Sequence, residues 1–133
     1  MKIVILDSDT VSTGDLSFSG IARFGEVKRY GLTEPERIAE RVRDAEIILC
    51  NKTFITREVM EKAPKLRYIG LFATGFNNID LECAKERGIA VANVKGYSTQ
   101  SVIQHTFALF FYLYEKMAYY DHFVKSVEYS RND

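Results

Sequence analysis

The residues best suited to chemistry lie in one polar loop, Ala73–Asp80, whose sequence is ATGFNNID. The apolar run before it, Tyr68–Phe72, is typical of a buried strand, and the segment after it, Leu81–Gly88, is typical of a helix that ends at a glycine. The loop therefore connects the carboxyl end of a strand to the start of a helix. Free backbone N–H groups and a positive helix end at such a junction suit a small anion, a carboxylate or a phosphate.

The same loop also has a simpler interpretation. Gly75 is expected to let the backbone turn where a Cβ atom would clash. Asn77, Asn78 and Asp80 each carry a side chain that can cap the first turn of the following helix. A capped turn that only reverses the chain would use these residues equally well, so the loop alone leaves both interpretations open.

The elements that must position this loop alternate between strands and helices. Short apolar runs predict five strands, at 2–6, 25–30, 46–50, 68–72 and 88–92. Between them, Thr33 is predicted to cap one helix, in a capping box with Glu36, and Thr56 is predicted to cap the next. This alternation predicts an α/β fold: a flavodoxin-like parallel sheet of five strands in the order 2-1-3-4-5, with helices on both faces.

Four polar residues directly follow strands of this predicted sheet, and they are Asp7, Asn51, Thr74 and Asn93. Ligands of open parallel sheets bind at the carboxyl ends of the strands. We therefore expect these four residues to converge on one edge of the sheet.

Composition excludes several classes of function. Eighteen basic residues balance eighteen acidic ones, which indicates neither a nucleic-acid nor an anionic membrane partner. Cys50 and Cys83 lack the spacing of a metal or redox motif and are expected to be small reduced hydrophobic residues. Strand residues follow Met1 directly, and the longest apolar run, Phe107–Tyr114, is too short to span a bilayer. We expect a soluble cytoplasmic protein without a metal site.

A single long helix is predicted from about Ser98 to about Val124, after a turn at Lys95–Tyr97. Its segment Phe107–Tyr114 is apolar all the way round, which is typical of a helix that is covered on every side. A five-stranded sheet can cover only one side, so we expect a partner outside these residues to cover the other. The predicted organisation is a domain at 1–97 and a crossover helix with its tail at 98–133.

Two of these stretches resemble motifs of the D-isomer-specific 2-hydroxyacid dehydrogenases, in particular the D-glycerate dehydrogenase and hydroxypyruvate reductase branch. The loop Ala73–Asp80 resembles the substrate loop of that family. The segment Asn93–Thr106, NVKGYSTQSVIQHT, resembles its interdomain crossover. Asn51–Thr53 also resembles the segment that follows the third strand in that branch, and the resemblance extends over the whole chain.

The resemblance implies an oxidoreductase that interconverts a small 2-keto acid, of the hydroxypyruvate type, and a D-2-hydroxy acid with NAD or NADP. The residues that it implies for substrate binding are Ala73, Thr74, Gly75, Asn51 and Lys52, the first three through their backbone amides. Thr74 and Thr106 would also approach the cofactor. The family further implies a homodimer in which the crossover helix is covered by a nucleotide-binding domain and by the second subunit.

Some features of such an enzyme are not found in these residues. The sequence has no G-x-G-x-x-G after a strand, so the nucleotide-binding Rossmann domain is expected to lie outside this chain. The catalytic arginine, glutamate and histidine of the family belong to that domain, and neither His105 nor His122 matches the histidine. We therefore expect no catalytic residue and no activity in this chain alone. Two positions depart from the family pattern, with Lys95 in place of a proline and Gln104 in place of a glutamate.

Two other classes are compatible with the predicted fold. A phosphoryl-accepting receiver domain would use Asp7 and Asp9 for a metal and Lys95 after the fifth strand. It also needs an aspartate after the third strand, where Cys50 and Asn51 stand instead. The other class is a non-catalytic ligand-binding or interaction domain that has lost its nucleotide partner, and the sequence does not separate that class from a dehydrogenase fragment.

Overall fold

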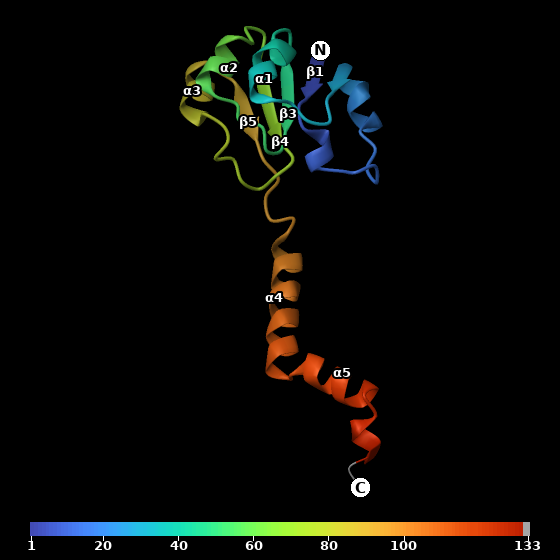
Figure 1. Cartoon of the computed structure of the whole chain (residues 1–133). Helices are drawn as coiled ribbons and strands as arrows, with labels where there is room; N and C mark the ends of the chain where they lie inside the picture. Colours follow the sequence, from blue (N-terminus) through green and yellow to red (C-terminus); the bar gives the residue numbers. More distant parts are fainter. Residues whose placement is uncertain (132–133) are drawn as a thin grey trace. The chain divides into compact units, whose positions relative to one another are not determined.

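Five parallel strands form one sheet in the first of two units into which the chain divides, Met1–Lys95 and Gly96–Asp133. The computed structural model describes residues 1–131 (Figure 1). The strands are β1 (Lys2–Ile5), β2 (Glu26–Arg29), β3 (Ile47–Cys50), β4 (Tyr68–Leu71) and β5 (Ala90–Ala92). Their order, β2-β1-β3-β4-β5, and their parallel pairing confirm the predicted fold class.

Three α-helices cover one face of this sheet, and they are α1 (Pro35–Val42), α2 (Arg57–Glu61) and α3 (Leu81–Glu86) (Figure 1). Side chains alternate across a strand, so Val4, Ile48 and Ile69 lie in register and point into the core beneath these helices. All three are almost fully buried. This packed face fixes the strand register, because a slip of one residue would turn the apolar side chains away from the helices.

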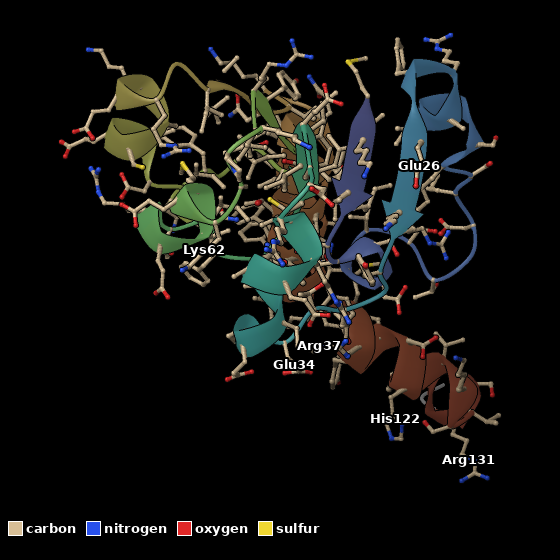
Figure 2. All side chains as sticks on the ribbon, turned by 90° about the horizontal axis from the view of Figure 1, so that it is seen from above. Glu26, Glu34, Arg37, Lys62, His122 and Arg131 are labelled. Carbon is tan, nitrogen blue, oxygen red and sulfur yellow. The ribbon has the colours of Figure 1, made fainter. Side chains whose placement is uncertain are left out.

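The opposite face carries the 3-10 helix η2 (Ser19–Phe24) in place of an α-helix. Residues of this helix and of the strands line an apolar hollow there, and they are Ile3, Ile21, Phe24, Ile47, Leu49 and Tyr68. Gly70 on β4 permits the packing of this face, because a Cβ atom would lie 2.7 Å from Leu49 Cδ2 and 3.0 Å from the Tyr68 ring. The charged side chains of Glu26, Arg37 and Lys62 point outward (Figure 2).

The predicted helix caps are only partly correct. Thr56 accepts a hydrogen bond from Val59 N and caps α2, as predicted. The predicted capping box at Thr33 is wrong, because α1 begins after Glu34 and has no side-chain cap. The Thr33 hydroxyl donates instead to the carbonyl oxygen of Leu6 at the end of β1.

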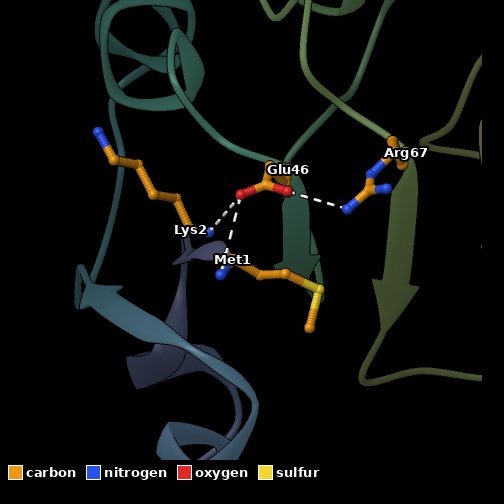
Figure 3. A network of polar contacts seen from close by, with 4 residues as sticks. All are labelled: Met1, Lys2, Glu46 and Arg67. Carbon is orange, nitrogen blue, oxygen red and sulfur yellow. Dashed lines mark hydrogen bonds and ion pairs between the residues drawn. The ribbon is translucent and has the colours of Figure 1, made fainter.

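Glu46 ties together the amino ends of three strands (Figure 3). Its carboxylate accepts hydrogen bonds from the backbone N–H of Lys2 at 3.0 Å and from Arg67 at 2.9 Å, and it lies 3.9 Å from the amino terminus of Met1. The N–H of Lys2, the charge of the amino terminus and Arg67 lower the pKa of Glu46. The carboxylate therefore contributes to stability only in its ionised form.

The second unit contains α4 (Thr99–Tyr114), α5 (Met117–Lys125) and the 3-10 helix η3 (Glu128–Arg131). The prediction of one long helix is wrong, because Lys116 adopts a left-handed conformation with φ 51° and separates α4 from α5. Neither glycine nor proline marks this break, so no residue type predicts it. Among the described residues, no helix is long and apolar enough to cross a membrane.

Helix α4 exposes its aromatic residues within this unit. Phe107, Phe110, Phe111, Tyr112 and Tyr114 expose between 48% and 70% of their surface. Neighbouring rings along the helix contact one another, with the Phe110 and Tyr114 centroids 5.7 Å apart and stacked. The aromatic residues thus form a continuous apolar surface on the helix, as the sequence predicts.

Replacement of Glu46 by glutamine is expected to make stability less dependent on pH. The pKa of Glu46 is lower in the folded chain than in the unfolded chain, so its contribution is complete at neutral pH and is lost as the pH falls through the folded value. The free energy of unfolding of Glu46→Gln should be below that of the wild type at pH 7, and the difference should shrink below about pH 4.

Urea unfolding followed by circular dichroism at pH 7, 5 and 3 measures this difference. Glu61→Gln is the matched control, because the Glu61 carboxylate makes no hydrogen bond or ion pair with the other described side chains and backbone groups. A constant difference between Glu46→Gln and the wild type over this range would contradict the assignment.

Candidate functional site

A pocket lies between the loops that follow β3 and β4, at the carboxyl ends of the strands. Its lining residues are Asn51, Lys52, Phe54, Ala73, Gly75, Asn77 and Asn78. Four of the five residues predicted to bind substrate therefore line one pocket, and Thr74 is the exception. The parallel order places β3 beside β4, so the two loops leave the sheet at the same edge.

The start of the loop after β4 is held through its backbone carbonyl groups. The carbonyl oxygen of Ala73 accepts from Val94 N at 3.0 Å, and that of Thr74 accepts from the Asn93 side chain at 2.7 Å. The Thr74 hydroxyl donates to the Val94 carbonyl oxygen at 2.8 Å. Within residues 1–131 the backbone N–H groups of Ala73, Thr74 and Gly75 donate no hydrogen bond, so three donors remain free for a ligand.

Gly75 has a different role from the predicted one. Its φ is not in the left-handed region, and a Cβ atom there would have its nearest contact at 3.4 Å, with Asn77 Oδ1. The prediction that the turn requires a glycine is therefore wrong. Since Gly75 lines the pocket, its missing side chain instead leaves room for a ligand beside the free N–H groups.

Only one of the three predicted caps of α3 is a cap. Asp80 accepts from Cys83 N at 2.9 Å, as predicted. Asn78 instead donates from its side chain to the carbonyl oxygen of Thr53 at 2.8 Å, which ties the loop after β4 to the loop after β3. Asn77 lines the pocket.

The loop after β3 contributes the cationic side of the pocket. Lys52 is exposed, and its ammonium group makes no hydrogen bond or ion pair with any other described residue. The Asn51 side chain is already used, because its Nδ2 atom donates to the Thr10 hydroxyl at 2.9 Å and to the Thr10 carbonyl oxygen at 3.1 Å. An anion in this pocket would therefore meet Lys52 and the free N–H groups rather than the Asn51 amide nitrogen.

Asp7 lies behind the loop after β3, and its geometry argues against the receiver interpretation. Asp7 is 3% exposed, and its carboxylate accepts four hydrogen bonds from residues 51–53. A receiver domain needs this carboxylate for its metal. Among the described residues, no group of three or more His, Cys, Asp or Glu side chains could hold a metal ion.

The remaining candidates are not among the residues that line this pocket. Thr106 is on α4, where its hydroxyl donates to the Val102 carbonyl oxygen at 2.8 Å. His105 and His122 are exposed on α4 and α5, and Figure 2 shows His122. Cys50 and Cys83 are buried and free, as predicted, and burial with the nearby Asp7 charge raises the pKa of Cys50 to about 12.

Comparison with known proteins identifies the family of this chain. The model of the D-isomer specific 2-hydroxyacid dehydrogenase catalytic domain matches residues 3–129. A hydroxypyruvate reductase of Blautia hydrogenotrophica is 46% identical over 112 residues, and a glycerate dehydrogenase of Methylorubrum extorquens is 30% identical over 132 residues. These matches cover 82% and 98% of this chain but only 35% and 41% of the two relatives, so the chain spans a minor part of their length.

This chain is also similar to a solved structure. The D-lactate dehydrogenase of Aquifex aeolicus, complexed with NAD and lactic acid, matches with a TM-score of 0.73 and 27% sequence identity. The match covers 100% of this chain and 39% of that one.

Substitutions of Gly75 should separate folding from ligand binding. Gly75→Ala should change the free energy of unfolding by less than about 1 kcal/mol, because the backbone there suits an L-residue. Gly88→Ala is the control for a glycine with positive φ, 66°, and should lose about 1 kcal/mol or more. Gly75→Val should remain folded but bind a small dicarboxylate such as oxalate about tenfold more weakly.

Urea unfolding and titration followed by nuclear magnetic resonance measure the two effects. If Gly75→Val binds oxalate as well as the wild type, Gly75 does not belong to the ligand pocket.

Proposed function

Because the chain belongs to the D-isomer specific 2-hydroxyacid dehydrogenase family, we propose that it is the substrate-binding part of an NAD- or NADP-dependent enzyme. The proposed reaction interconverts a small 2-keto acid and a D-2-hydroxy acid of the hydroxypyruvate and glycerate type. The observation that carries this proposal is the set of three free N–H groups at Ala73, Thr74 and Gly75, beside the free cation of Lys52.

This arrangement suits the carboxylate that every 2-keto and 2-hydroxy acid carries. Backbone N–H groups bind a carboxylate with charge-assisted hydrogen bonds, and they need no further ordering here because the Ala73 and Thr74 carbonyl oxygens already fix the loop. Lys52 adds an opposite charge. Binding by these groups would orient the substrate by its carboxylate, while Asn51 and Phe54 border the rest of the pocket.

The nicotinamide cofactor would supply or accept the hydride. The described residues include no dinucleotide-binding loop, so its main site would lie in a separate nucleotide-binding domain. Thr74 and Thr106 are the residues of this chain proposed to approach it. Catalytic acid–base residues would likewise lie in that domain, with 1–97 as the substrate-binding domain and 98–133 as the crossover segment. We also propose a cytoplasmic location, for which the two free buried cysteines give support.

The chain alone should bind substrate analogues without turning substrate over. NADH oxidation with hydroxypyruvate or glyoxylate should not exceed that of a heat-inactivated control, because hydride transfer needs a positioned nicotinamide and an acid–base group. Oxalate should shift the amide resonances of Ala73, Thr74 and Gly75. Lys52→Met keeps most of the side-chain length and should weaken oxalate binding several-fold, by loss of one charge-assisted interaction of about 1 kcal/mol.

Either of two results would contradict this proposal. One is turnover by the isolated chain, which would place the chemistry within it. The other is oxalate binding that leaves the resonances of 73–75 unchanged.

We further propose that α4 takes part in a homodimer. Its exposed aromatic surface supports this, because burial of apolar surface contributes about 25 cal/mol per Å² before the costs of association. In sedimentation equilibrium the chain should associate, and Phe107→Ser/Phe111→Ser should shift it toward monomer. Gln104→Ser on the same helix is the control. A wild-type monomer at high concentration, with its helices intact by circular dichroism, would contradict the proposal.

A further inference from the structure

Asp7 is a charged residue in the interior that does not line the candidate pocket. Its Oδ1 atom accepts from Asn51 N at 2.8 Å, and its Oδ2 atom accepts from Lys52 N at 2.6 Å and Thr53 N at 2.8 Å. The Thr53 hydroxyl donates to Oδ2 as well, at 2.9 Å. Three consecutive N–H groups thus donate to one carboxylate. The anion stabilises this backbone conformation, because it is the acceptor that all three N–H groups share.

The backbone of Asp7 strengthens the same arrangement. Its carbonyl oxygen accepts from the Thr10 hydroxyl at 2.7 Å and from Thr10 N at 3.1 Å. The Asn51 side chain then donates to Thr10, so Asp7, Thr10 and Asn51 form a closed ring of hydrogen bonds. This ring fixes the start of the loop after β3 relative to the end of β1.

The fixed segment in turn holds the loop after β4. Asn78 donates from its side chain to the Thr53 carbonyl oxygen at 2.8 Å, and Ile55 N donates to the Asn78 carbonyl oxygen at 2.9 Å. Asp80 N donates to the Ile55 carbonyl oxygen at 3.1 Å. A continuous chain of hydrogen bonds therefore leads from Asp7 through residues 51–55 to residues 78–80. These two segments contribute Asn51, Lys52, Phe54 and Asn78 to the pocket lining.

We propose that Asp7 is a positioning residue of the substrate site. It holds residues 51–53 so that Lys52 faces the pocket, and through Asn78 it sets the distance between Lys52 and the free N–H groups of 73–75. This inference rests on the proposed function, since it assigns Asp7 to that same carboxylate site. The negative charge of Asp7 is itself enclosed by four donors on the side that faces these residues, so it does not replace Lys52 as the charge that the ligand meets.

Asp7→Asn tests the proposal in the 133-residue chain. An asparagine keeps the shape but presents an NH₂ group to at least one of the three N–H donors. Amide hydrogen exchange at 51–53 should become at least about tenfold faster, the Asn78 side-chain resonances should shift, and the Kd for oxalate should rise about tenfold. Asp9→Asn is the matched control: it makes the same change of charge two residues away, at an exposed carboxylate that, among the described residues, accepts only from Ser8. It should alter none of these.

A double-mutant cycle distinguishes positioning from a general loss of stability. If Asp7 acts through the segment that Asn78 binds, Asp7→Asn/Asn78→Ala should raise the Kd for oxalate little more than Asp7→Asn alone. Independent, additive effects would overturn the proposal. In the wild type, NMR couplings across the hydrogen bonds from the 51–53 amides to the Asp7 carboxylate test the contacts should Asp7→Asn fail to fold, and their absence would also overturn it.

The two proposals fail in different ways. A wild-type chain that does not bind oxalate contradicts the proposed function, and the exchange rates and Asn78 resonances, measured without ligand, still decide the role of Asp7. Wild-type oxalate binding with unchanged exchange and affinity in Asp7→Asn contradicts the positioning role alone.

Discussion

A carboxylate in a protein interior must be surrounded by donors, and Asp7 meets this constraint with the backbone of a neighbouring loop. The donors are available because β1 and β3 are adjacent and parallel, so both chains leave the sheet at the same edge. The strand order therefore determines which loop the buried anion organises. The carboxylate of Asp7 binds the loop after β3, and the Asn78 side chain connects that loop to the loop after β4.

The candidate site shows a second regularity, in the backbone of 73–75. The carbonyl oxygens of Ala73 and Thr74 accept from residues 94 and 93, whereas the three N–H groups of the segment have no acceptor in the part of the chain that the structure describes. A loop held in this way keeps its conformation without using the donors that a ligand needs. Preorganised donors of this kind lose little entropy on binding, which is the physical basis of a selective anion site.

The sequence predicts the features that depend on local pattern. The strand order, the caps Thr56 and Asp80 and the location of the loop 73–80 follow from apolar periodicity and residue type, and the structure confirms them. Two of the errors arise because a partner far away in the sequence forms the contact. The Thr33 hydroxyl donates to the Leu6 carbonyl oxygen, and the Asn78 side chain donates to the Thr53 carbonyl oxygen, so neither caps a helix. The role of Asp7 depends on residues more than forty positions away, which no local pattern reveals.

Two side chains that line the pocket do not take part in the hydrogen bonds that hold its loops. Phe54 is 64% exposed, and Asn77 makes no side-chain hydrogen bond with other residues of 1–131. The scaffold beneath them is held by backbone groups, Asp7 and Asn78 instead. Under the proposed function, substitutions at these two positions would change the size and polarity of the acid that the pocket accepts, without rebuilding the fold. The proposed site would then divide into a fixed anchor for the carboxylate and replaceable walls for the variable remainder, a division that would let one scaffold diversify across related acids.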